Sequence, residues 1–553
     1  MRSPLPPTPL TRTLLSRIET GRLVLYSLVA GGLVGLLGSG WRYVLDWSVT
    51  QAASLIGYRP PGVAGEGGLL MAFGDAAPWG LLLLPLAAVL YAWLIPGERG
   101  DPLDQVVAGY HARGEWPGPL VQLQTLLATL VGHAAQLLVG RDSTFTALGS
   151  LSALLLGRLS RLDAVTRRTL TLASVAAALG LVLHAPLASA VLMTETLYRR
   201  FEFEFELLMP CVLASVCAAA VYGLLWGFDP LFALPGTLSV SAGQLLVSLL
   251  LAGIVTGVAW LLTQVVRVLP ASLTVGWPRL LLAGGFGLLT AALALRGTPA
   301  VLGSGSGWLQ LALSGFLGPE ASGMAAWRWL LMALGARLAF GGGVLVSAST
   351  GGLLGVALTS LLGLNLDLPV AALVGAAAFL SVTLNAPVAA ALLTVTWGGE
   401  TLLPAVLAAS GLAHALSGEA SLVAAQVRDR GASRIHSVLI SPLARPGAAR
   451  APEPDQKPAA SRASADPARQ LYREPLPRSW QGARAGILSL PAGLELMGVV
   501  RQGQVLLARP ELPLQPGDEL LLLASPAVHA GWLDTMRLPE QRQTLAETPQ
   551  ALR

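Results

Sequence analysis

The sequence predicts an all-α polytopic membrane protein with an internal repeat, followed by a small β-rich α/β domain. Three observations predict this fold class. Of the 553 residues, 53% are hydrophobic and only 12% are charged, whereas about a quarter of a soluble domain is charged. One apolar stretch recurs in the second half of residues 23–427. After Val427, the composition changes abruptly to a polar, proline-rich sequence.

The N-terminal residues 1–22 carry four arginines and a single glutamate before the first apolar run. Arginine-rich short segments stay in the cytoplasm, so we expect a cytoplasmic N-terminus. The isoelectric point near 9.5 then reflects membrane topology. Basic patches interleaved with aromatic residues are typical of nucleic-acid binding, and none is present, so we expect no nucleic-acid partner.

Residues 23–427 are predicted to form the membrane domain, as two repeats at about 23–227 and 238–427. A helix needs roughly 20 apolar residues to cross a hydrocarbon core of ~30 Å, and several segments approach this length. So many segments exclude a cleaved signal peptide. The expected helices are Trp79–Ile95, Leu120–Val139, Phe145–Leu156, Leu207–Leu225, Leu245–Val266, Leu280–Leu295, Val344–Leu362 and Leu402–Leu416.

No metal centre and no ATP-driven pump are expected. Cys211 and Cys217 are six residues apart and point to different faces of one helix, and the six histidines lack metal-ligand spacing. No glycine-rich segment ends in Gly-Lys-Ser/Thr. We therefore expect a protein that is not an enzyme, holds no resident cofactor, and moves a solute passively or coupled to another ion.

The internal repeat joins Leu172–Leu192 to Leu373–Leu393, 201 residues later, with the pair Ala185-Pro186 matching Ala386-Pro387. Similar composition explains the apolar matches but not the shared Ala-Pro pair. Duplicated halves with apolar segments broken by Gly or Pro are typical of secondary transporters and related channels.

Before each repeated segment lies a polar break marked by glycine, at residues 140–149 and 341–352. A helix that begins inside a membrane presents free N–H groups and the positive end of its dipole. Two such ends facing one another bind an anion without a fixed positive charge. A full cation would bind the anion too tightly to release it. The breaks therefore predict a pathway for chloride or another small anion.

Two further regions follow the membrane domain. Residues 428–470 are rich in Pro, Ala, Ser and Arg, which predicts a flexible linker. A β pattern returns over residues 471–540, and residues 541–553 form a tail. The expected strands are Leu494–Val500, Gln504–Leu507 and Glu519–Leu523.

The chain resembles the CLC family of chloride channels and proton-coupled chloride transporters over about Gly21 to Val427. The family motifs Gly-Ser-Gly-Ile-Pro, Gly-Arg-Glu-Gly-Pro, Ala-Pro-Leu-Ala and Gly-Ile-Phe-Ala-Pro, and a glycine-rich segment, correspond to Glu98–Pro102, Gly140–Thr144, Ala185–Thr196, Gly343–Ser347 and Gly303–Trp308. The resemblance implies an inverted repeat and a homodimer in the lipid bilayer, with one anion pathway in each subunit.

The resemblance also implies the residues of the anion pathway, which are Arg99, Gly100, Asp101, Gly140, Arg141, Asp142, Ser143, Gly343, Val344, Leu345, Val346 and Leu422. Several depart from the family pattern. Asp142 replaces the gating glutamate, and Arg99 replaces the anion-coordinating serine. Thr196 replaces the proton-relay glutamate of the transporters, although the neighbouring acid Glu195 is kept. No tyrosine is present near Leu422, where the family has one.

Each charged candidate has a second, structural interpretation. Asp142 is either a gate or only a helix N-cap, for which Asp is well suited. Arg99 either contacts the anion or is exposed in a solvent vestibule, and Arg141 either takes part in the pathway or braces loops through backbone carbonyls. Glu195 either relays protons or pairs with the two arginines that follow it.

The C-terminal module is similar to the C-terminal half of the RCK regulators of potassium transport (the TrkA-C type) over roughly Arg473 to Met536. Leu514–Ala524 is its most specific piece. In that family the module dimerises and binds small ligands such as nucleotides or ions. Both an unidentified small ligand and a purely dimer-stabilising role are compatible with the sequence.

The leading hypothesis is a homodimeric anion channel or uncoupled anion transporter, with chloride as the first choice of anion. It is placed in a membrane of the bacterial inner-membrane type, with both termini cytoplasmic. Alternatives are a proton-coupled antiporter that uses Asp142, transport of another anion such as bicarbonate or nitrate, and a membrane receptor. A potassium transporter would need a filter such as Thr-Val-Gly-Tyr-Gly, and none is present.

Overall fold

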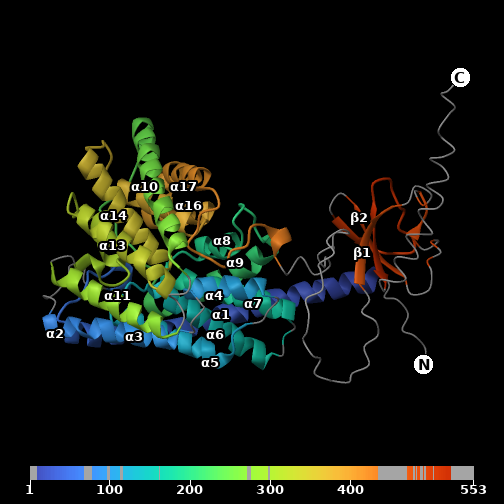
Figure 1. The fold of residues 1–553 in the computed structure, drawn as a ribbon, viewed down its shortest axis with the longest axis horizontal. Helices are drawn as coiled ribbons and strands as arrows, with labels where there is room; N and C mark the ends of the chain where they lie inside the picture. Colours follow the sequence, from blue (N-terminus) through green and yellow to red (C-terminus); the bar gives the residue numbers. More distant parts are fainter. Residues whose placement is uncertain are drawn as a thin grey trace, which may run out of the picture. The chain divides into compact units, whose positions relative to one another are not determined.

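The computed structural model describes residues 9–67, 77–95, 100–112, 116–160, 162, 164–270, 276–296 and 299–433, and residues 470–524 apart from short gaps. The chain divides into two units, Met1–Ile435 and His436–Arg553. Among the described residues, the regular elements of the first unit are helices, and those of the second are four strands (Figure 1).

The helical unit contains both long helices and short ones. Among the residues that the structure describes, six helices are long and apolar enough to cross a membrane, by length and composition. The α-helices are α1 (Pro9–Ile56), α2 (Pro78–Leu81), α3 (Leu83–Leu94), α4 (Pro102–His111), α5 (Pro119–Ala134), α6 (Arg141–Leu159), α7 (Ala164–Val182), α8 (Pro186–Glu195), α9 (Phe205–Trp226), α10 (Ala242–Val268), α11 (Trp277–Leu295), α12 (Ser306–Leu313), α13 (Ala321–Gly335), α14 (Val344–Leu362), α15 (Leu368–Thr383), α16 (Pro387–Gly398) and α17 (Leu403–Ser417).

Hydrophobic runs located most of these helices but not all of their ends. Helix α14 has the expected bounds, and α9, α10, α11 and α17 lie within about three residues of theirs. Helix α5 ends at Ala134 instead of Val139, because the chain turns at Gln136 with φ of 58°. Helix α6 is longer than expected and begins at Arg141.

The repeat is visible in the backbone. Both α8 and α16 begin at the proline of an Ala-Pro pair, and the preceding alanines have φ, ψ of −140°, 69° and −136°, 75°. One residue earlier, His184 and Asn385 have φ of 50° and 52°, a left-handed conformation that is uncommon outside glycine. The same unusual turn therefore starts both short helices.

Helix α9 marks the two faces of the helical unit. It begins beside Glu204, which binds Arg430 at 2.9 Å, and ends at Trp226, whose ring lies 4.3 Å from the guanidinium carbon of Arg42. Its 22 residues span about 33 Å at 1.5 Å per residue, close to a bilayer core. We call the two sides the Glu204 face and the Arg42 face.

Equivalent turns of the two repeats lie on opposite faces. Nδ1 of His184 is 2.8 Å from the carbonyl of Asp229, and its ring lies 6.2 Å from that of Tyr222 near the Arg42 face. The side chain of Asn385 instead donates to the carbonyl of Arg199 at 2.9 Å, on the Glu204 face. The repeat is therefore inverted, as the resemblance implied.

Small residues let the helices that support the polar breaks pack closely. A Cβ atom at Gly351 would lie 2.7 Å from the carbonyl of Gly375, so α14 and α15 touch through their backbones. In the first repeat, a Cβ at Gly149 would lie 2.8 Å from the carbonyl of Ser174 on α7. Close approach at small residues is typical of helix pairs in membranes.

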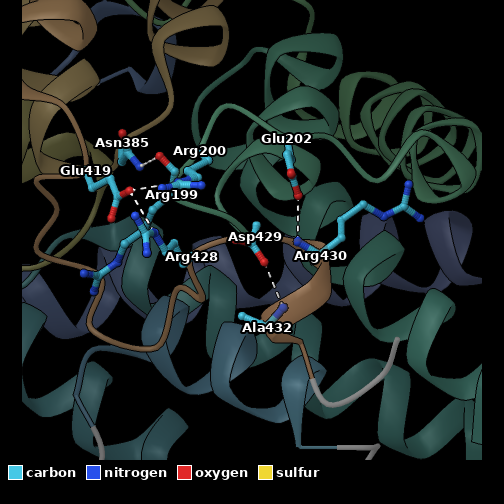
Figure 2. Close-up of polar contacts among 9 residues, drawn as sticks. All are labelled: Arg199, Arg200, Glu202, Asn385, Glu419, Arg428, Asp429, Arg430 and Ala432. Atoms are coloured by element: carbon cyan, nitrogen blue, oxygen red, sulfur yellow. Dashed lines mark hydrogen bonds and ion pairs between the residues drawn. The ribbon is translucent and has the colours of Figure 1, made fainter. Parts of the chain in front are cut away.

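Residues 428–433 belong to the helical unit, and their assignment to a flexible linker is wrong. The guanidinium of Arg428 pairs with Glu419 at 3.3 Å, and Glu419 also pairs with Arg200 at 3.0 Å. The backbone amide of Arg430 donates to Glu202 at 2.6 Å (Figure 2). These partners lie far away in sequence, so composition alone could not reveal them. Residues 434–469 lie outside the described residues.

The C-terminal unit is an antiparallel sheet of order β1-β4-β2-β3. Its strands are β1 (Gln470–Pro475), β2 (Glu495–Arg501), β3 (Gln504–Leu507) and β4 (Glu519–Ala524). The last three match the expected strands, whereas β1 was not expected, since its polar sequence lacks the apolar alternation of an isolated strand. Residues 525–553, including the predicted tail, lie outside the described part.

Candidate anion site

The two polar breaks bring the first residues of α6 and α14 together. Both helices follow a glycine that provides no side-chain cap, Gly140 and Gly343, and Gly343 has φ of 97°. A Cβ atom at Gly343 would collide with the carboxylate of Asp142. The missing side chain therefore lets the carboxylate reach the start of α14.

The carboxylate of Asp142 is bound to the start of the opposite helix. Oδ2 accepts a hydrogen bond from the backbone amide of Val344, and the backbone of Leu345 also interacts with it. The residue is 1% exposed, and within the described part of the chain its Oδ1 has no hydrogen-bond partner. Asp142 is the second residue of α6 and not its N-cap, so the interpretation as a simple cap of its own helix is wrong.

A second carboxylate lies beside the first. Oδ1 of Asp101 accepts a hydrogen bond of 2.7 Å from the hydroxyl of Ser143. Its Oδ2 accepts one of 3.1 Å from the amide of Leu103, so Asp101 is the N-cap of α4. A Cβ atom at Gly342 would lie 2.8 Å from that of Asp101. Asp101 therefore joins α4 to the starts of both α6 and α14.

The two carboxylates separate two cavities. One, of about 180 Å³, lies toward the Glu204 face and is bordered by Gly100, Asp101, Gly343, Arg337 and Leu422, among others. The other, of about 220 Å³, lies toward the Arg42 face, and its wall includes Asp46, Arg59, Glu66, Arg141 and Ser304. The starts of α6 and α14, with Asp142 between them, form the barrier.

Residues 80–418 match the model of the family described as voltage gated chloride channel. The chain belongs to this family. It is accordingly a multi-pass membrane protein of the CLC fold, and the family consists of anion channels and transporters. Described helices that are long and apolar enough to cross a membrane agree with this assignment.

Individual relatives are distant. The chain is 26% identical over 365 residues to a chloride/fluoride channel protein of Pseudomonas syringae pathovar tomato, which covers 64% of this chain and 79% of the relative. A CLC-type fluoride/proton antiporter has a TM-score of 0.60 at 21% identity, covering 74% of this chain and 99% of its own. For a slow cyanobacterial Cl⁻/H⁺ antiporter the values are 0.57, 20%, 73% and 96%. These structures share the fold of this chain.

The arginines of the family motifs have different positions. Arg141 forms an ion pair with Glu66 at the cavity on the Arg42 face. Its partner is thus a carboxylate, and the expectation that it braces backbone carbonyls is wrong. Arg99 lies outside the described residues.

Glu195 closes the start of another helix. Its Oε1 accepts from the amide of Val388 at 3.0 Å and its Oε2 from that of Ala389 at 2.7 Å, at the beginning of α16. The alternative in which Glu195 pairs with the two arginines that follow it is wrong, because both of its oxygens accept from amides of α16, while Arg199 donates to the carbonyl of Ala424 and Arg200 pairs with Glu419. The hydroxyl of Thr196 donates to the carbonyl of Leu192 at 2.7 Å.

Leu422 lies in the wall of the cavity on the Glu204 face. Its amide donates to the carbonyl of Thr383 at 2.8 Å. The carboxylate of Asp104 fixes the same loop by accepting from the amide of Ala425 at 2.7 Å. No local pattern connects Asp104 with this loop, since 321 residues separate the partners.

Sequence reasoning also missed Arg328 of α13, which is fully buried. Its guanidinium donates to the carbonyls of Ala300 at 2.7 Å and Ser304 at 2.6 Å, and to the hydroxyl of Ser349 at 3.1 Å. It thereby holds the glycine-rich segment against α14. A lone arginine in an apolar helix was the available signal, because buried charges in membranes need partners.

The remaining pathway candidates contribute backbone and packing. Leu345 and Val346 are completely buried in α14, and the carbonyl of Gly100 accepts from the side chain of Gln105 at 3.0 Å. Among the described residues, no group of His, Cys, Asp and Glu has the arrangement of a metal site.

Proposed function

We propose that the chain carries small monovalent anions, chloride foremost, between the two cavities and past the starts of α6 and α14. The observation that carries this proposal is the bond from the amide of Val344 to the carboxylate of Asp142. A carboxylate is an anion on a tether, and helix N-termini attract anions through free N–H groups and the dipole. A free anion takes the same position when Asp142 moves away.

Asp142 is the proposed gate. Its side chain fills the space between the cavities. Only Oδ2 of the carboxylate accepts a hydrogen bond from the described residues, and Oδ1 is left without a partner among them. A group bound at only part of its hydrogen-bonding capacity is displaced more readily than a fully bonded one. Movement of this side chain toward the Arg42-face cavity would free the amide of Val344 for a passing anion.

We propose passive transport, without stoichiometric proton exchange. A coupled carrier needs an acid that exchanges protons on the far side of the gate. Thr196 has no carboxyl group, and both oxygens of Glu195 are bound by amides of α16. The aspartate side chain is also shorter than glutamate by one methylene, a loss of reach of about 1.3 Å, because a C–C bond measures ~1.5 Å.

A proton-coupled antiporter is the second candidate. It is favoured by the titratable carboxylate of Asp142 inside the barrier, and two of the similar solved structures are antiporters of fluoride or chloride with protons. The cargo is a small anion in both candidates, and bicarbonate and nitrate also suit backbone amides.

For the assembly, we propose a homodimer in a bacterial inner membrane. Large apolar side chains such as Leu187, Met209 and Leu407 are 59%, 62% and 47% exposed on α8, α9 and α17, and lipid and a second copy would cover them. Helix α1 passes Arg42 at one face, so its earlier turns lie toward the Glu204 face, where residue 433 also lies. Two ends on one face agree with two cytoplasmic termini.

For the C-terminal unit, we propose a regulatory role of the RCK type, with or without a small ligand. Its support is the β-rich unit that follows residue 435 and the resemblance of Leu514–Ala524.

The test of the function is ion flux in liposomes that contain the purified protein. A tenfold chloride gradient should drive chloride movement, while an internal pH dye records no uphill proton movement. Asp142→Ala should keep chloride flux. Potassium flux in the presence of impermeant anions would overturn anion transport, and uphill proton movement that Asp142→Ala abolishes would establish the antiporter instead.

A further inference from the structure

We propose that Asp101 is a second gate on the anion route, at which its carboxylate competes with the passing anion for the hydroxyl of Ser143. The inference rests on the proposed function, because it assigns a role within the same route. It adds a residue that acts on the Glu204-face side of the barrier, whereas Asp142 acts at the start of α14.

Asp101 lies at the end of the barrier that borders the cavity on the Glu204 face. Its carboxylate borders the 180 Å³ cavity and accepts the Ser143 hydroxyl at 2.7 Å. Ser143 directly follows Asp142 in α6, so the two carboxylates bind adjacent positions of the barrier. The bond from Leu103 to Asp101, at 3.1 Å, fixes the side chain in this position.

The carboxylate of Asp101 and a passing anion compete for the hydroxyl of Ser143. A serine hydroxyl has one hydrogen to donate, and here that hydrogen points to Asp101. An anion that enters from the cavity therefore finds this donor already used. The hydroxyl becomes available to the anion when the carboxylate of Asp101 turns away, or when loss of its charge weakens its bond to that hydrogen.

The charges around Asp101 also oppose an anion. Asp142 of α6 and Asp104 of α4 are carboxylates that face it, and Tyr91 of α3 lies nearby with its hydroxyl bound to the carbonyl of Ala339. The guanidinium of Arg337, across the cavity, donates to the carbonyl of Val266 at 3.1 Å. Among the described residues, no cation forms an ion pair with Asp101.

A carboxylate at this position makes the route close at two points. The first closure occupies the amide of Val344, and the second occupies the hydroxyl of Ser143. Each uses the donor that a permeating anion requires, so an anion crosses only when both donors are released. This arrangement predicts low flux in the resting protein and a large increase when the charge of Asp101 is removed.

The test is chloride flux of Asp101→Asn in liposomes. Asparagine has nearly the same size and is as good an N-cap as aspartate, so α4 keeps its start while the charge disappears. Removal of a like charge a few ångströms from an anion lowers the barrier substantially, and we expect flux to rise by about tenfold. Flux equal to that of the wild type would overturn the inference.

A matched control carries the same change away from the route. Asp367 precedes α15, is exposed, and makes no side-chain cap. Asp367→Asn should therefore leave chloride flux unchanged. An equal increase in both variants would assign the effect to overall charge and would also overturn the second gate.

Ser143→Ala tests the shared hydroxyl through a double-mutant cycle. If the two groups act through one bond, Asp101→Asn should raise flux far less in the Ser143→Ala background than in the wild type. Equal increases in both backgrounds would show that Ser143 is not the disputed donor. Should Asp101→Asn not purify as a folded protein, Asp101→Ser also keeps an N-cap without charge and should give the same increase.

The outcomes separate the two proposals. If neither the wild type nor any of these variants moved an anion, the proposed function itself would be overturned. Anion flux in the wild type that does not change in Asp101→Asn or Asp101→Ser would remove the second gate alone.

Discussion

The starts of α14 and α16 show how one kind of contact serves two purposes. Each start receives a carboxylate from the first repeat: Asp142 at α14, and Glu195 at α16. Glu195 has both oxygens bound, by the amides of Val388 and Ala389. Asp142 has one oxygen bound and the other without a partner. The contact of Glu195 therefore uses both carboxylate oxygens, whereas the contact of Asp142 uses one.

The surroundings differ in the same way. The Asp142 contact lies between two cavities, with its neighbours Gly343 in the wall of one and Arg141 in the wall of the other. Glu195 is as deeply buried as Asp142, each being 1% exposed, but it sits between packed helices, where the side chain of Trp397 on α16 also donates to the carbonyl of Leu183. We infer that Glu195 clamps the two repeats together, whereas Asp142 is a removable anion.

The largest expected effect is on stability, from Glu195→Ala. The substitution leaves two buried amides at the start of α16 without a partner, and each such group costs about 1–3 kcal/mol. We expect a loss of about 2–4 kcal/mol, seen as a lower thermal unfolding temperature of the purified protein in detergent. Glu195→Gln keeps one acceptor and should fall in between.

Asp142→Ala is the matched variant, since it removes the other carboxylate of the comparison. We expect a loss of less than about 1 kcal/mol, because an anion from the buffer replaces the side chain at the amide. Equal losses from Asp142→Ala and Glu195→Ala would contradict the distinction between a gate and a clamp.

A smaller effect is expected from shortening the chain. Glu202 and Glu204 hold residues 428–433 through Arg430, in a clamp like that of Glu195. A protein that ends after Ile435 should keep its stability and chloride flux. A protein that ends after Val427 should lose stability, because Glu204 is buried and loses its guanidinium partner. Unfolding temperature and flux measure both variants, and identical behaviour would show that the segment holds nothing.

The smallest effect concerns a carboxylate in the C-terminal unit. The Arg501 guanidinium, 2.8 Å from Asp518, holds the pKa of that carboxyl below its usual value. A lowered pKa contributes stability above the unfolded pKa of about 3.9, and this stability is lost as pH falls through the folded pKa. The hydrogen-exchange protection of residues 513–520 in the full chain, relative to the intrinsic exchange rate at each pH, should fall below pH 4, and less so in Asp518→Asn. The same acid response in both proteins would exclude this pair.

The sequence predicted the parts of the fold that depend on local pattern. Apolar runs located α9, α10, α11 and α14 among the long helices, and the repeated Ala-Pro pair, at whose prolines α8 and α16 begin, revealed the duplication. Strand β1 and the folded segment 428–433 were missed. Both are polar, and both are ordered by partners distant in the sequence, β4 in one case and Glu202 with Glu204 in the other.

The sequence predicted where the candidate site lies, but not which residues contact one another there. The two glycine-marked breaks do meet, and Asp142 lies where they meet. Which amide it binds, and the partner of Glu195, could not be predicted, since those contacts join residues 202 and 193 positions apart. The two arginines that follow Glu195 suggested a local ion pair, but its oxygens instead bind backbone amides of the second repeat.

The most direct measurement of the central claim is chloride binding to the purified protein by calorimetry. If the carboxylate of Asp142 occupies the anion site, Asp142→Ala should bind chloride more tightly than the wild type, by about tenfold, since one unit of competing charge is gone. Glu195→Gln should bind chloride as the wild type does. Equal chloride affinity in Asp142→Ala and the wild type would contradict the assignment of this position as the anion site.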